Sequence, residues 1–303
     1  MVRSKTVWPA VALLTTCAVA LVAAQTAAPP QTRQLSANGV NLTYVDEGKG
    51  TPVVFVHGAL SDLRFWEPQR QAFASRYRFI AYTYRYHGTE PWPDEGKNYS
   101  GTTHAADLAA FLSGLKAGPV HLVGLSYGGI LGAVVAAEHP ELVRSLTLAE
   151  PALFSLIADK PEAKPSLDEF NTGVGEVVPL MKAGDMTGAL KIFTALVTGR
   201  GPDAFDKLPP LAQLMFKDNG RTLPLVFAVP LPPITCETVS KVKTPTLIVE
   251  GAQTPAFFRE IDKAVLSCIA GSRLVTIPDA SHPMSADNPA AFNKAVLEFI
   301  AKR

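Results

Sequence analysis

One stretch decides how this chain folds: Val120-His121-Leu122-Val123-Gly124-Leu125-Ser126-Tyr127-Gly128-Gly129. Its apolar first half is typical of a buried strand, and residues 130–138 continue with helical rather than alternating spacing. The Gly-x-Ser-x-Gly pattern between them predicts a sharp strand-to-helix turn with Ser126 at its tip. Such a turn holds the serine oxygen clear of strand and helix, where a base can take its proton. The stretch therefore predicts a nucleophilic serine.

Composition limits the class of protein. The 303 residues are 47% hydrophobic and 18% charged, which excludes a disordered chain and predicts one globular unit with a large core. The formal net charge is +1, and no basic run follows a helix or loop. This balance argues against nucleic acid as a partner, and it leaves open a substrate without charge.

The N-terminus has the pattern of a secretory signal peptide, which we place at residues 1–24. Two basic residues precede the apolar run Val7 to Ala23, and small residues follow at a cleavage point. The alternative is a membrane anchor, but Pro9 interrupts the run, which is shorter than the ~20 apolar residues that a span needs. We expect a secreted or periplasmic protein whose mature chain has no stable membrane span and begins with a flexible lead-in, residues 25–32.

Removal of the signal peptide leaves two cysteines, Cys236 and Cys268. Disulfides persist outside the cytosol, so a bridge between the two is one interpretation. Two separate buried thiols are the other. The sequence leaves both open, because it does not show whether the two Cα atoms approach within the ~7 Å that a disulfide requires.

Strand and helix patterns alternate along two parts of the chain, residues 33–151 and 243–303. This alternation predicts an α/β fold, a parallel sheet with helices on both faces. Residues 152–242 do not show this alternation of strands and helices. Because the segment is too long for an ordinary loop, we interpret it as a helical cap. On the core helix before Val120, we expect His104 to be a helix-face histidine and Asp107 a solvated acid.

A second motif, His57-Gly58-Ala59, follows the continuous apolar run Val53 to Val56, which suits a strand buried on both faces. A serine hydrolase needs two backbone N–H donors for the oxyanion of its tetrahedral intermediate. One is the amide after the nucleophile, and the other comes from the loop after the third strand. Here the donors would be Tyr127 and Ala59. His57 is either a base or a brace for this loop, and we favour the brace.

Five segments together resemble the α/β-hydrolase superfamily: residues 53–60, 122–129, 146–151, 244–251 and 277–283. The resemblance implies an eight-stranded, mostly parallel sheet with helices on both faces and a helical cap inserted after strand 6. It also implies an active site at the carboxyl ends of the strands, with Ser126 as nucleophile and His282 as general base and acid. Of six histidines, His282 alone lies where this superfamily places its base.

The triad acid is where the chain departs from the commonest pattern of this superfamily. Many relatives carry an aspartate in a Gly-x-x-Asp segment after the seventh strand, where this chain has Gly251-Ala252-Gln253-Thr254. Glu150 can take the role, because it ends the sixth strand 24 residues after Ser126, a spacing like that in haloalkane dehalogenases and zearalenone-lactone hydrolases. The alternative is that Glu150 only caps its strand. The next candidates for the triad acid are Glu250, Asp279 and Glu260.

This constellation suits acyl transfer, in which Ser126 attacks a carbonyl, His282 takes its proton and water releases the acyl enzyme. Dehalogenases and epoxide hydrolases carry aspartate as nucleophile, so Ser126 argues against both. We expect a secreted carboxylic-ester or lactone hydrolase that uses no metal and no cofactor. The motif leaves open a carbon–carbon bond hydrolase, a cofactor-free haloperoxidase, and a binding or receptor protein with little turnover.

Apolar side chains in and near the cap predict a pocket for a small apolar ester or lactone. Packing within the cap is the alternative role of these side chains. The candidates are Leu60, Trp92, Phe154, Phe193, Phe216 and Phe227. The sequence does not determine the substrate's identity or the oligomeric state.

Overall fold

The structure is a computed structural model, and it describes residues 30–92, 94–232 and 234–303. The predicted signal peptide, residues 1–24, and most of the predicted lead-in lie outside the described residues. Residues 31–303 form one unit. Its first strand begins at Thr32, so this strand overlaps the end of the predicted lead-in by one residue.

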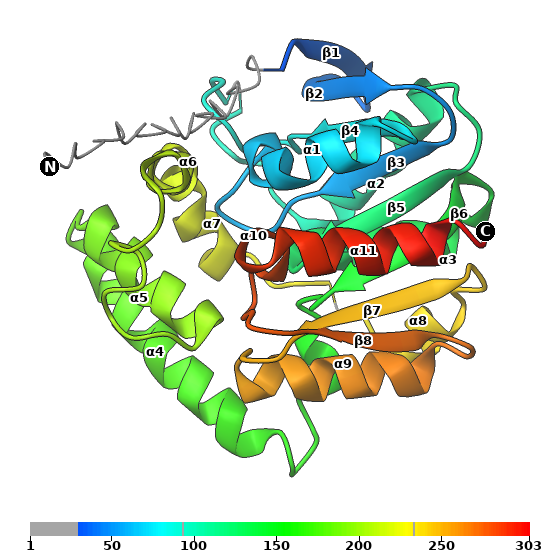
Figure 1. Ribbon diagram of the computed structural model, residues 1–303. Helices are drawn as coiled ribbons and strands as arrows, with labels where there is room; N and C mark the ends of the chain where they lie inside the picture. The colour runs from blue at the N-terminus through cyan, green and yellow to red at the C-terminus, as the bar shows by residue number, and fades with distance from the viewer. Residues whose placement is uncertain (1–29, 93, 233) are drawn as a thin grey trace, which may run out of the picture. The chain divides into compact units, whose positions relative to one another are not determined.

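One sheet contains eight strands: β1 (Thr32–Ala37), β2 (Val40–Gly48), β3 (Pro52–Val56), β4 (Arg78–Tyr82), β5 (Val120–Leu125), β6 (Val143–Ala149), β7 (Thr246–Gly251) and β8 (Arg273–Ile277). Their order across the sheet is β1-β2-β4-β3-β5-β6-β7-β8 (Figure 1). β2 is antiparallel to β1 and β4, and the other neighbours are parallel. The predicted eight-stranded, mostly parallel sheet is therefore confirmed.

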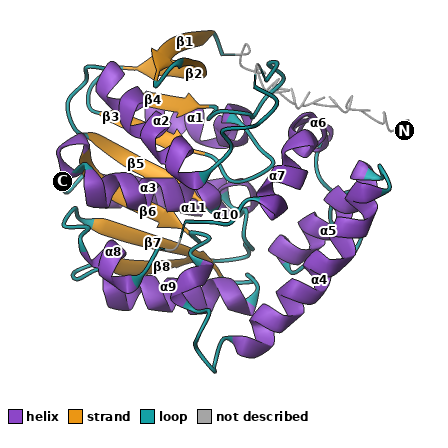
Figure 2. Cartoon of the chain, turned by 180° about the vertical axis from the view of Figure 1, so that it is seen from behind, coloured by secondary structure: helices purple, strands orange, loops and turns teal. Residues whose placement is uncertain are grey.

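Helices cover both faces of this sheet (Figures 1 and 2). One face carries α1 (Glu67–Ala74), α10 (Met284–Asp287) and α11 (Pro289–Ile300), which share an apolar cluster with the strands. The other face carries α2 (Gly101–Gly114), α3 (Tyr127–Glu138), α8 (Cys236–Ser240) and α9 (Ala256–Cys268), over a larger cluster. Two short 3₁₀ helices complete the core, η1 (Leu63–Trp66) and η2 (Pro140–Leu142).

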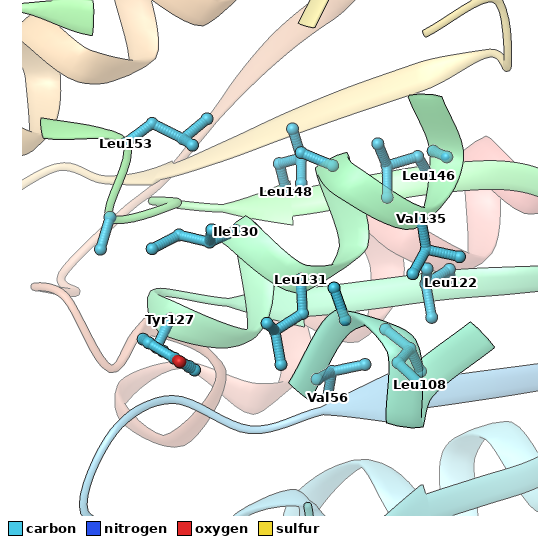
Figure 3. Packing of buried hydrophobic residues seen from close by; sticks show 14 of the residues in the cluster. Val56, Leu108, Leu122, Tyr127, Ile130, Leu131, Val135, Leu146, Leu148 and Leu153 are labelled. Atoms are coloured by element: carbon cyan, nitrogen blue, oxygen red, sulfur yellow. The ribbon is translucent and has the colours of Figure 1, made fainter. Parts of the chain in front are cut away.

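The helix that follows Ser126 is anchored by its packing on the two central strands. Nine of the twelve residues of α3 are buried. Figure 3 shows their apolar side chains over those of β5 and β6, with Ile130, Leu131 and Val135 from the helix and Leu122, Leu146 and Leu148 from the strands. Burial of each such side chain stabilises the fold by about 1.5–3 kcal/mol. The start of α3 is therefore a rigid support for the serine.

The chain between β6 and β7 is helical in its described part. It comprises η3 (Phe154–Leu156), α4 (Lys164–Lys182), α5 (Met186–Thr198), α6 (Pro210–Asn219), η4 (Gly220–Thr222), α7 (Leu223–Ala228) and α8. The last of these, α8, contacts α3 and α9 and so packs with the helices on the sheet. No helix in the described ranges is both long enough and apolar enough to cross a membrane.

Cys236 and Cys268 form a disulfide, with their Cα atoms 5.3 Å apart. The bridge joins the first residue of α8 to the last residue of α9. It therefore ties the end of the segment between β6 and β7 to a helix of the core.

The expectation that Asp107 is a solvated acid is wrong. The side chain is fully buried, and its carboxylate accepts hydrogen bonds from Arg85 at 2.7 Å and from Asn38 at 2.8 Å. His104 on the same helix is also buried, with Nδ1 at 2.8 Å from the Tyr127 hydroxyl. The local sequence could not reveal these contacts, because the partners of Asp107 lie 22 and 69 residues away along the chain.

Candidate active site

Ser126 sits at the sharp turn between β5 and α3, with φ of 55° and ψ of −118°. This left-handed backbone region is costly for a residue with a side chain, and such outliers concentrate at functional sites. Close backbone contacts enforce the turn. A Cβ on Gly124 would lie 2.4 Å from the Gly128 carbonyl oxygen, and one on Gly128 would lie 2.4 Å from that of Val56. Only glycine fits at either position.

Glu150 lies beside Ser126 at the end of the neighbouring strand. Leu125 pairs with Ala149 in the sheet, and the Ser126 amide donates to the Ala149 carbonyl at 3.0 Å. Glu150 follows directly, with φ of 41°. Its Oε2 lies 2.7 Å from Nδ1 of His282, which stands in the loop after β8. The structure thus brings together the acid and the histidine that the sequence predicted, next to the predicted nucleophile.

The Glu150 carboxylate is fully buried and surrounded by donors. Oε1 accepts from the Gly251 amide at 2.7 Å, and Oε2 accepts from the Thr254 hydroxyl at 2.8 Å as well as from His282. Hydrogen bonds of this kind fix the orientation of the carboxylate. An ionised carboxylate only accepts, so Nδ1 of His282 carries the proton and Nε2 is left with its lone pair as a base.

The histidine ring is held from one side and its loop from another. Phe258 of α9 stacks on His282 with ring centroids 3.9 Å apart and planes at 9°. In the loop, the Ser281 amide donates to Asp287 at 2.9 Å, and the Ser281 hydroxyl donates to the carbonyl of Thr198 at the end of α5. The segment between β6 and β7 therefore contacts the loop that carries the base.

The Ser126 hydroxyl is half-buried and has no hydrogen-bond partner among the described residues. The structure thus brings Glu150 and His282 into contact but does not form the hydrogen bond from Ser126 to His282. Catalytic hydrogen bonds are commonly long in the absence of substrate and shorten in the reacting complex.

The two predicted oxyanion donors flank Ser126. Tyr127 follows it directly, and the loop after β3 passes close by, since a Cβ on Gly58 would lie 3.2 Å from the Ser126 Cβ. Within the described part of the chain, neither the Tyr127 amide nor the Ala59 amide donates a hydrogen bond. Both are therefore available to an oxyanion. The next residue, Leu60, has φ of 57°, another strained backbone position in this loop.

His57 is a brace for this loop rather than a base exposed to substrate. It is fully buried, with Nδ1 at 2.8 Å from the Gly58 carbonyl oxygen and Nε2 accepting from the Tyr84 amide at 3.4 Å. Burial lowers its pKa to about 4, so the ring is neutral at pH 7. Both ring nitrogens are engaged within the protein.

The other acids considered for the triad have different surroundings. Glu260 pairs with Lys263 at 2.8 Å, and Asp279 is exposed. Burial and the nearby Glu150 raise the pKa of Glu250. Of the four acids, Glu150 is the one whose carboxylate is hydrogen-bonded to His282.

The structure separates the predicted pocket residues into three groups. Leu60, Phe193, Phe216 and Phe227 belong to one apolar cluster, which also includes Ala59. Phe154 instead packs against aromatic rings that include Phe258, the residue stacked on His282. Trp92 lies under the guanidinium of Arg221 and lines a cavity of about 820 Å³ that does not include Ser126.

Asn219 of α6 joins the segment between β6 and β7 to the loop after β3, residues 57–62, which we call the oxyanion loop. The sequence did not suggest this link. Its side chain is fully buried, donates to Asp62 at 2.7 Å, and accepts from the Gly88 amide at 2.6 Å. Asp62 also binds Arg64, which pairs with Asp218. The partners are too far apart in sequence for a local pattern to connect them.

As for metals, the described residues contain no group of three or more histidine, cysteine, aspartate or glutamate side chains that could hold an ion.

The sequence pattern of the Alpha/beta hydrolase family matches residues 53–295, which include every element of the site. The chain belongs to this family. The 2-hydroxy-6-oxo-6-(2'-aminophenyl)hexa-2,4-dienoic acid hydrolase of Metapseudomonas resinovorans is 28% identical to it, over 89% of this chain and 91% of that protein. The 2-(acetamidomethylene)succinate hydrolase of Mesorhizobium japonicum is 25% identical, over 88% and 94%.

A solved structure shares the fold of this chain. An esterase from Exiguobacterium antarcticum has a TM-score of 0.72 against this alpha/beta hydrolase at 23% identity, covering 89% of this chain and 100% of the esterase. The predicted membership in the superfamily is confirmed, and the relatives support a hydrolase.

Proposed function

We propose that this alpha/beta hydrolase cleaves a carboxylic ester or lactone through a Ser126–His282–Glu150 triad and an acyl enzyme. The observation that carries the proposal is the 2.7 Å contact between Glu150 and Nδ1 of His282, at strand ends that also place Ser126 on its turn. Acyl transfer to water requires a buried carboxylate that orients a histidine and a serine whose oxygen can reach the substrate.

The proposed reaction has two halves, formation of the acyl enzyme and its hydrolysis. Ser126 Oγ forms a bond to the carbonyl carbon while its proton passes to Nε2 of His282, and the Ala59 and Tyr127 amides stabilise the oxyanion. The carbonyl re-forms, the C–O bond to the alcohol breaks, and His282 returns the proton to the departing oxygen. Water then attacks the acyl enzyme by the same route and releases the acid. Glu150 stabilises the imidazolium in both halves.

An uncharged, apolar substrate fits the surroundings best. Ala59 belongs to the same apolar cluster as Leu60 and Phe193, so the side of the oxyanion loop that faces the helices between β6 and β7 is hydrophobic. Sites that bind small organic ligands are lined mostly by apolar side chains. The prediction of an ester or lactone of modest size rests on this cluster.

A second candidate is hydrolysis of a carbon–carbon bond. The relative from Metapseudomonas resinovorans is named as a hydrolase of a 2-hydroxy-6-oxo-dienoic acid, and it covers most of this chain. One fold hosts many reactions, and the same serine, histidine and acid would also serve this one.

Turnover of a panel of chromogenic short-chain esters, lactones and a 2-hydroxy-6-oxo-dienoic acid tests the proposal. We expect a burst of alcohol release from the esters, and Ser126→Ala should abolish this burst. In the native protein, mass spectrometry should find the acyl group on Ser126. Turnover of the dienoic acid alone would favour the second candidate. No turnover of any ester or lactone would refute the first.

We also propose export from the cytosol. The N-terminal pattern of residues 1–24 and the Cys236–Cys268 disulfide both support it, because such bridges persist in oxidising compartments. N-terminal sequencing of the protein recovered from its native compartment should begin at Gln25. Recovery of the uncleaved chain from the cytosol with free thiols would contradict this proposal.

A further inference from the structure

The carbonyl oxygen of Gly58 accepts three hydrogen bonds. Nδ1 of His57 lies 2.8 Å from it, and the hydroxyls of Ser61 and Tyr84 donate to it at 3.0 Å each. A carbonyl oxygen has two lone pairs, so three donors saturate it and leave its direction no freedom. All three side chains are buried.

This carbonyl belongs to the peptide unit that supplies the Ala59 amide. A peptide unit is planar and trans, so its C=O and N–H bonds point in opposite directions. Donors that fix the Gly58 carbonyl therefore fix the Ala59 N–H as well. The unit lies against the nucleophile, because a Cβ on Gly58 would approach the Ser126 Oγ to 3.8 Å.

Tyr84 is itself held firmly. It follows β4, is almost fully buried, and stacks on His57 with ring centroids 4.1 Å apart and planes at 11°. The Tyr127 ring packs on it with centroids 5.7 Å apart. Burial raises the pKa of Tyr84 well above its usual value, so its hydroxyl keeps the proton that it donates.

A neighbouring tyrosine provides the contrast. Tyr82 lies two residues earlier, at the end of β4, and is also fully buried, stacked on Phe111 at 4.7 Å. Its hydroxyl has no hydrogen-bond partner in the described part of the chain. The two tyrosines therefore share burial and aromatic packing, but only Tyr84 donates to the oxyanion loop.

We propose that Tyr84, together with Ser61, is a positioning residue of the oxyanion hole, which holds the Gly58–Ala59 peptide so that the Ala59 amide meets the oxyanion formed on Ser126. The inference rests on the proposed acyl-transfer function. Donors fixed in advance stabilise the transition state without reorganisation when charge develops. Loss of the Tyr84 hydroxyl should therefore lower kcat and leave KM nearly unchanged.

The test compares Tyr84→Phe with the matched control Tyr82→Phe on the best short-chain ester. We expect kcat of Tyr84→Phe to fall by about tenfold, less than the loss of a whole oxyanion donor because two other donors remain. Its KM should stay within about twofold, and Tyr82→Phe should match the native enzyme. Ser61→Ala should lower kcat in the same direction, and it serves as the test if Tyr84→Phe does not fold.

The affinity for a boronic acid, compared with that for the acid product, separates a loss of oxyanion stabilisation from a general loosening of the fold. The boronate forms a tetrahedral adduct on Ser126 that imitates the intermediate, so its affinity should fall by the same factor as kcat/KM in Tyr84→Phe. Binding of the acid product should not change.

Three results separate the possible failures. A folded Tyr84→Phe with native kcat, or an equal loss in Tyr82→Phe, would overturn the role of Tyr84. A folded Ser61→Ala with native kcat would remove Ser61 from it. Failure of the native protein to hydrolyse any ester, with no labelling of Ser126 by a fluorophosphonate, would instead refute the proposed function on which the inference rests.

Discussion

Thr254 donates its hydroxyl to Oε2 of Glu150 at 2.8 Å, the same oxygen that lies 2.7 Å from Nδ1 of His282. Thr254 stands where many relatives carry the triad aspartate. In this chain the carboxylate comes from the end of β6, and the residue at the usual acid position supports it as a hydrogen-bond donor. The proposed acid therefore lies one strand along the sheet from the usual position, and it contacts the histidine there.

The Thr254 hydroxyl should therefore matter to catalysis. Thr254→Val keeps the shape of the side chain but leaves Glu150 with one donor fewer, so we expect kcat on an ester to fall by about tenfold. Thr254→Ser should restore most of the rate. Thr147→Val is the control, because Thr147 is also buried and its hydroxyl has no partner among the described residues. Equal rates in the two valine variants would contradict the role of Thr254.

The strands and the serine turn could be predicted from the sequence because their signals are local. Apolar runs mark the buried strands, and Gly124 and Gly128 mark the tight contact at Ser126. The partners of Glu150 could not be predicted in this way, because Gly251 and Thr254 lie 101 and 104 residues further along the chain.

Helices between β6 and β7 extend beyond their most apolar stretches. The apolar stretch 177–181 is only part of α4, which spans 19 residues and leaves most of its surface exposed. The helical period continues through its first half at Leu167, Phe170 and Val174, with charged and polar residues between them. The disulfide could not be decided either, since the 5.3 Å between the Cα atoms depends on how α8 and α9 pack.

Asp262 of α9 should make stability depend on pH. It is fully buried, and neither carboxylate oxygen has a partner in the described part of the chain. Burial, reinforced by Glu150 and Glu250, holds the pKa of Asp262 well above its usual value, whereas the unfolded chain loses this proton near pH ~4. Between those two pKa values the folded state binds more protons, so the free energy of unfolding falls as pH rises.

Asp262→Asn removes this titration. In urea unfolding, we expect the stability of the variant relative to the native protein to increase as the pH rises above ~4, up to the folded-state pKa of Asp262. The replacement amide can add a constant offset, so the slope with pH is the quantity to compare. A difference that stays flat across this range would show that Asp262 has the same pKa in both states.

The Cys236–Cys268 bridge should stabilise the fold without taking part in the reaction. Its two cysteines are 32 residues apart in sequence, a loop length for which restriction of the unfolded chain is worth about 3–4 kcal/mol. Dithiothreitol should lower the free energy of unfolding of the native protein by this amount. It should have no effect on the Cys236→Ala, Cys268→Ala double variant, whose kcat should equal the native value where both are folded. A native protein indifferent to reductant would contradict the prediction.

The most direct test of the account is the rate of Glu150→Gln on an ester that the native enzyme hydrolyses. Glutamine keeps the volume of the side chain but removes the charge that fixes the His282 tautomer and stabilises the imidazolium. We predict that kcat falls by about 10³–10⁴ with the melting temperature largely retained, while the control Glu250→Gln, half-buried nearby, stays close to native. A folded Glu150→Gln enzyme within about tenfold of the native rate would show that Glu150 is not the acid of this triad.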